Sequence, residues 1–213
     1  MACKYGEWNR DQDEALLNIL GGQAVAEKII ARKVRVTIEE LEETLLESRS
    51  FLKLISGAKT LELAETDGKA TIANAKDTFP GGIYGLAGDR NVSSQATEKT
   101  QVSVHEMIRD GTFAQIWNGL SDDLNSLCLT QSQIVQFVQK HRQWLRTNGY
   151  ATFFLFKVRD EFFVAFVYVR GAGRLGVLVY RFSFDYVWGA GSRHRVVVPC
   201  LPAGTAQLIS VTA

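Results

Sequence analysis

The stretch that decides the fold runs from Gln131 to Ser183. It opens with QSQIVQFVQKHRQWLR at 131–146 and continues as YATFFLFKVRDEFFVAFVYVRGAGRLGVLVYRFS at 150–183. The first part places apolar residues every three to four positions, which predicts an amphipathic helix. Thr130 is a suitable N-cap for this helix, and Asn148-Gly149 is suited to end it.

Four strands are expected after this helix, over 150–158, 161–169, 175–183 and 193–198. The dipeptide Arg159-Asp160 has the length of a two-residue hairpin turn, so the first two strands are expected to pair side by side. Both faces of these strands are apolar: Phe154 and Phe156 lie on one face, and Phe153 and Leu155 lie on the other. We therefore expect the helix to cover one face and the acidic N-terminal portion, or a partner, to cover the other.

The rest of the chain divides by composition into two further parts. Residues 1–50 predict a helical N-terminal unit, in which Thr37-Ile38-Glu39-Glu40 forms a capping box. Residues 51–100 predict short strands and a loop-rich linker with clustered glycines, and the domain boundary is expected there. Residues 101–213 then form an α+β domain. The expected fold class is α+β: a helical N-terminal unit, a loop-rich middle, and a C-terminal helix packed on a four-stranded antiparallel sheet.

The charges are unevenly distributed along the chain, although its 213 residues carry a formal net charge of only +1. Residues 131–213 hold ten basic and three acidic side chains, and residues 1–130 hold 14 basic and 20 acidic ones. The C-terminal part is therefore +7 and the N-terminal part −6. A split of this kind favours a polyanion ligand for the basic part, or neutralisation of one part by the other.

Several function classes are not favoured by the sequence. No apolar run approaches the roughly 20 residues that span a bilayer, and the N-terminus lacks the apolar core of a signal peptide, so we expect a cytoplasmic protein without membrane contact. The three cysteines, Cys3, Cys128 and Cys200, are far apart and show no zinc-ligand spacing. This spacing predicts no metal site. No cofactor is expected either, because the phosphate-binding and nucleophile motifs are absent.

Ser192-Arg193-His194-Arg195 is the one segment that suggests catalysis. A histidine between arginines could serve phosphodiester cleavage, with the imidazole as acid or base and the guanidinium groups on the phosphate. The alternation of side chains along a strand argues against a catalytic role for His194. In an extended strand His194 would share a face with Val196 and Val198 and not with the arginines. A small ribonuclease-like enzyme that uses His194 is therefore the alternative hypothesis, with enzyme activity not favoured.

The leading hypothesis is a binding or interaction protein that contacts RNA or an acidic partner through its basic C-terminal domain. Arginine supplies eight of the ten basic residues there, and arginine with aromatic residues suits single-stranded nucleic acid. The expected binding residues are Arg146, Arg181, Arg193 and Arg195. A third hypothesis is a structural protein without an external polyanion ligand, in which the glutamates of 39–47 neutralise these arginines.

Long parts of the chain resemble a set of hypothetical proteins from small-genome, candidate-phylum bacteria. The resemblance rests on segments from the N-terminus to the last strand, and it is most specific where Trp144-Leu-Arg-Thr-Asn-Gly-Tyr150 runs through Thr152–Val169 to Arg193-His-Arg195; the other segments are WNRDQDEALLN at 8–18, LGG at 20–22, 51–60 and DGTFAQ at 110–115. It implies a bacterial cytosolic protein with a modular N-terminal unit. It implies no activity and no site residues.

Overall fold

A single mixed β-sheet organises the part of the chain that the structure describes. The computed structural model describes residues 27, 50–57, 61–86, 90–148 and 150–200. Its strands are β1 (Leu52–Leu54), β2 (Leu61–Leu63), β3 (Ile83–Tyr84), β4 (Thr100–Met107), β5 (Ala151–Val158), β6 (Glu161–Val169), β7 (Leu175–Arg181) and β8 (Arg195–Pro199). The helical segments are α4 (Phe113–Asn118), η2 (Leu124–Leu127), α5 (Gln131–Lys140), η3 (Arg142–Trp144), η4 (Gly171–Gly173) and η5 (Ala190–Ser192).

The predicted four-stranded antiparallel sheet is wrong. The sheet has eight strands in the order β1-β4-β8-β5-β6-β7-β3, with β2 paired to β4. Strand β8 lies between β4 and β5 and is parallel to β5, and β3 is parallel to β7, so the sheet is mixed. Strand β8 can enter the middle of the sheet because its valines at 196–198 are buried on both faces, as the residues of β5 are. Its backbone also pairs with β4 on one side and with β5 on the other, so the buried backbone groups of these strands are satisfied.

The local elements of 130–181 follow the sequence prediction closely. Val158 pairs with Glu161 across the two-residue turn, where Arg159 has a positive φ of 55°. Thr130 caps α5, and its side chain and that of Gln133 form a capping box. The regular helix ends at Lys140, earlier than predicted, because His141 leaves the helical conformation and η3 follows it.

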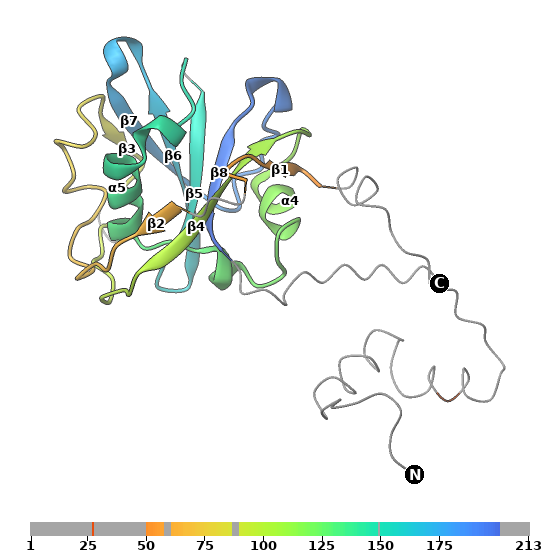
Figure 1. The fold of residues 1–213 in the computed structure, drawn as a ribbon, viewed down its shortest axis with the longest axis horizontal. Helices are drawn as coiled ribbons and strands as arrows, with labels where there is room; N and C mark the ends of the chain where they lie inside the picture. Colours follow the sequence, from red (N-terminus) through yellow and green to blue (C-terminus); the bar gives the residue numbers. More distant parts are fainter. Residues whose placement is uncertain (1–26, 28–49, 58–60, 87–89, 149, 201–213) are drawn as a thin grey trace. The chain divides into compact units, whose positions relative to one another are not determined.

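Both faces of the sheet are covered, as the apolar strands require. Helix α5 packs on the face that carries Phe154 and Phe156, and α4 packs on the face that carries Phe153 and Leu155. Figure 1 shows these two helices on opposite sides of the sheet. The face that carries Phe153 and Leu155 is therefore covered in part by α4, which belongs to the predicted C-terminal domain itself. The residues of α4 that pack there are Phe113, Ile116 and Trp117. The predicted helical unit at 1–50 lies outside the described residues, apart from residues 27 and 50.

The predicted linker contributes to the core. Ile72 and Phe79, which lie between β2 and β3, are buried against the α5 face of the sheet. The backbone N–H of Ile72 donates to Gln131 Oε1 at 3.1 Å, and Gln131 Nε2 donates to the backbone oxygens of Arg90 and Val92 at 2.9 and 3.2 Å. The described residues from Ser50 to Cys200 consequently belong to one compact unit.

Loss of the N-cap of α5 is expected to destabilise the fold. Thr130 Oγ1 accepts from the Gln133 N–H at 3.2 Å, and Gln133 Oε1 accepts from the Thr130 N–H at 2.9 Å. We expect Thr130→Ala to lower the free energy of unfolding by about 1 kcal/mol, because helix N–H groups lose their acceptors. Urea unfolding of this variant beside Thr147→Ala, an exposed threonine in the loop before β5, measures the effect. Equal stability of the two variants would contradict the assignment.

Candidate site at the arginine-rich end of the sheet

Strand register brings a group of arginines to one end of the sheet. Arg195 begins β8 and lies opposite Glu106 of β4 and Thr152 of β5. At the same level β6 ends at Val169, which pairs with Leu175 at the start of β7. The connections η3–β5, β6–β7 and η5–β8 therefore meet at this end, which is the upper end in Figure 1. We call it the arginine-rich end; its members are Arg142, Arg146, Arg170, Arg174, Arg193 and Arg195.

Backbone carbonyls hold the side chains of Arg195 and Arg146. Arg195 Nη1 donates to the carbonyl oxygens of Trp144 and Leu145 at 2.8 and 3.3 Å. Arg146 Nε donates to the carbonyl oxygen of Ser192 at 3.1 Å, and its guanidinium lies over the ring of Tyr150, 5.3 Å from the ring centroid. Neutral acceptors orient these side chains without removing their positive charge.

One carboxylate lies inside the group. Glu106 Oε1 accepts from Arg193 Nε at 2.8 Å and Nη2 at 2.7 Å. The Arg193 side chain remains 65% exposed, whereas that of Glu106 is 12% exposed. Asp110 lies at the same end, and its Oδ1 accepts from the Ala190 N–H at 2.7 Å. Within the described part of the chain, the six arginines of this end outnumber its two carboxylates, so these residues together carry a net positive charge.

The pKa of Arg195 reflects the positive charges that surround it. Burial lowers the pKa of Arg195 from its usual value; Arg146 and Arg193 act in the same direction, and Glu106 opposes them. Its Nε is buried and has no hydrogen-bond partner within the described part of the chain. A bound anion would offset the repulsion among these cations and raise that pKa again.

A hollow lies between two loops at this end, and Arg170 is among the residues that line it. It has an empty volume of about 850 Å³ and is lined by Thr147, Asn148 and the segment 169–173. Arg142 donates from Nη2 to the carbonyl oxygen of Gly173, which ties η3 to this segment. Arg170 belongs to this segment and Arg174 follows it, and both are exposed. These two side chains are consequently accessible to a ligand from solvent.

The structure separates Arg181 from the other three predicted binding residues. Arg181 ends β7 opposite Phe163, at the end of the sheet that carries the β5–β6 turn. Its Nη1 lies 2.8 Å from Glu161 Oε1. Arg146, Arg193 and Arg195 lie together at the arginine-rich end. The glutamates at 39–47, which the structural hypothesis pairs with these arginines, lie outside the described residues.

His194 is placed under aromatic rings. Its side chain is 5% exposed and stacks on Phe153 with 4.9 Å between ring centroids. Nδ1 accepts from the Ala151 N–H at 3.2 Å, which assigns the proton of the neutral ring to Nε2. Burial lowers the pKa of His194 to about 4, and Arg146 contributes in the same direction. At neutral pH the imidazole therefore acts as a packed acceptor for the backbone.

Sequence reasoning missed Arg142, Arg170 and Arg174 as part of this group. The predicted strands 161–169 and 175–183 leave 170–174 as the connection between them, but the position of η3 and of β8 beside this loop depends on non-local pairing. Glycines in 171–173, flanked on both sides by arginine, are the signal that could have drawn attention to this loop.

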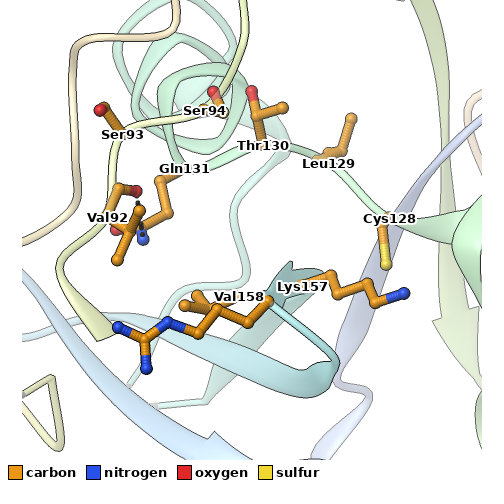
Figure 2. Close-up of a pocket in the computed structure, with 10 residues that line it drawn as sticks. Val92, Ser93, Ser94, Cys128, Leu129, Thr130, Gln131, Lys157 and Val158 are labelled. Carbon is orange, nitrogen blue, oxygen red and sulfur yellow. Dashed lines mark hydrogen bonds between the residues drawn. The ribbon is translucent and has the colours of Figure 1, made fainter. Parts of the chain in front are cut away.

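A second hollow lies at the opposite end of the sheet. Figure 2 shows it between the segment 92–94, the start of α5 and the end of β5, and its empty volume is about 550 Å³. Lys157 and Arg159 are among its lining residues, and Lys157 Nζ donates to Asn125 Oδ1 at 3.0 Å. Cys128 also lines it, and burial raises the pKa of the Cys128 thiol to about 12, so this thiol is not a nucleophile at neutral pH.

Within the described ranges, no group of three or more His, Cys, Asp and Glu side chains is arranged to hold a metal ion. None of the helices in the same ranges is long and apolar enough to cross a bilayer. Comparisons of the chain with protein-family models, with curated proteins and with solved structures find no match.

Proposed function

We propose that this chain is an RNA-binding protein that contacts phosphate groups through the arginine-rich end. The observation that supports this function is the convergence of six arginines from three connections on one end of the sheet. Among the described residues, Glu106 and Asp110 are the carboxylates that contact this end. Guanidinium groups bind phosphate oxygens with paired hydrogen bonds, and a cluster of them attracts a polyanion over a distance set by salt.

The exposed Arg170 and Arg174 are expected to account for part of the salt dependence of RNA binding. For the double variant Arg170→Gln, Arg174→Gln we expect the slope of log K against log salt to become shallower by about 1.4, since each phosphate contact on a single strand contributes about 0.7. The measurement is fluorescence anisotropy of the full chain with a labelled single-stranded RNA across a series of salt concentrations.

The double variant Arg159→Gln, Arg181→Gln is the matched control. It removes the same charge from the opposite end of the sheet and should leave the slope close to that of the unmodified chain. Equal slopes for all three proteins, or affinity that ignores salt, would refute an electrostatic site at the arginine-rich end. If the chain binds polyglutamate in preference to RNA, the proposed ligand is an acidic protein and not a nucleic acid.

A further inference from the structure

Four aromatic side chains after β6 form a row on the α4 side of the sheet. We call Tyr180, Phe184, Tyr186 and Trp188 the aromatic row. Tyr180 and Phe184 are stacked with 5.0 Å between centroids and 21° between planes. Phe184 and Tyr186 are also near-parallel, at 6.1 Å and 14°. Tyr186 meets Trp188 edge to face at 4.8 Å. Tyr180 also meets Trp188 edge to face at 5.8 Å, so both ends of the row rest on the core.

The two middle rings of the row are accessible to solvent. Phe184 is 42% exposed and Tyr186 is 52% exposed, whereas Trp188 is 8% exposed and anchors the row in the core. The core at this point is itself aromatic, because Phe113 stacks on Trp188 at 5.2 Å and Phe153 approaches Trp188 at the same distance. The exposed rings are therefore mounted on a rigid base, which lowers the entropy lost when a planar ligand stacks on them.

The row leads to the arginine-rich end. Trp188 contacts His194 at 5.6 Å, and His194 contacts Tyr150 at 6.1 Å between ring centroids. Tyr150 is 39% exposed and carries the guanidinium of Arg146 above its ring. The buried Trp188 and His194 therefore connect the row to Tyr150 and Arg146, and Arg193 precedes that histidine in the chain.

We infer that the ligand of the proposed RNA site is single-stranded, and that its bases stack on Phe184 and Tyr186 while its phosphates meet the arginines. This inference rests on the proposed function and adds the form of the nucleic acid. Bases in a duplex are already stacked and cannot offer their faces, whereas unpaired bases can. Asp185, between the two rings in sequence, disfavours phosphate there, which assigns the phosphates to the arginines and the bases to the rings.

The first test compares two ligands on the full chain. One is an oligouridylate of about 12 nucleotides, and the other is an abasic phosphodiester strand of the same length. The expected result is at least about tenfold tighter binding of the strand with bases, with the same salt slope for both, because stacking adds affinity without ionic contacts. A duplex RNA of equal length should bind no better than the abasic strand.

The second test uses variants of the rings. Both the double variant Phe184→Leu, Tyr186→Leu and the double variant Phe184→Ala, Tyr186→Ala should lose the preference for the strand with bases, because leucine keeps apolar volume but has no π face. Tyr84→Ala is the matched control: Tyr84 is 52% exposed on β3, at the far edge of the sheet, and this variant should retain the preference.

The outcomes separate this inference from the proposed function. Equal binding of the two strands by the unmodified chain, or retention of the preference by the leucine variant, overturns stacking while salt-dependent RNA binding stands. Absence of RNA binding at any salt concentration overturns both. Tight binding of an apolar peptide with no binding of either strand would assign the exposed rings to a protein partner and also overturns both.

Discussion

Replacement of Phe153 by alanine is expected to lower the free energy of unfolding by about 3–5 kcal/mol, the usual range for a large aromatic side chain removed from a core. Phe153 is fully buried in the middle of β5. Its ring lies 5.5 Å from Phe113, 5.2 Å from Trp188 and 4.9 Å from His194, measured between centroids. Alanine would leave a cavity at the point where α4, β5 and β8 meet, and the surrounding rings are too rigid to fill it.

Urea unfolding followed by tryptophan fluorescence measures this loss. Tyr84→Ala, at an exposed ring on the edge strand β3, serves as the control and should cost far less, because that side chain is half in solvent already. A loss below about 1 kcal/mol for Phe153→Ala would show that the α4 face of the sheet is not packed as described.

Acidification is expected to destabilise the fold between about pH 6.5 and pH 4 through two histidines. Burial lowers the pKa of His105 to about 4, and burial with Arg146 lowers the pKa of His194 to about 4. Above pH 6.5 both rings are neutral in the folded and the unfolded chain, so they contribute nothing to the pH dependence. Below that pH the two histidines bind protons in the unfolded chain but remain neutral in the folded chain. The free energy of unfolding therefore falls until the pH reaches the pKa of the folded state.

The slope of this decline identifies its source. Each histidine contributes at most about 1.4 kcal/mol per pH unit within the window, since one proton separates the two states. The free energy of unfolding, measured in urea from pH 7 to pH 4.5, should therefore fall less steeply for the double variant His105→Gln, His194→Gln than for the unmodified chain. Carboxylates titrate alike in both proteins and cancel from the comparison, so parallel curves would rule out the two histidines as the cause.

Arginine positions show what the sequence could and could not predict about the candidate site. The excess of positive charge after residue 130 is visible in the sequence, and it favours Arg146, Arg193 and Arg195 as binding residues. It favours Arg181 equally, yet β7 places Arg181 at the other end of the sheet, where Glu161 pairs with it. Composition reports the sign of the charge, whereas strand direction decides which charges share a surface.

The sequence by itself determined the local elements: the α5 cap at Thr130, the two-residue turn at Arg159-Asp160, and strands with two apolar faces. These depend on short-range periodicity, capping and turn length, which a few neighbouring residues encode. Only the tertiary structure decided that β8 enters between β4 and β5, that α4 packs on the second face, and that three connections gather their arginines at one end. Two-faced apolar strands can accept several neighbours in either direction, so the choice among them depends on contacts between residues far apart in the chain.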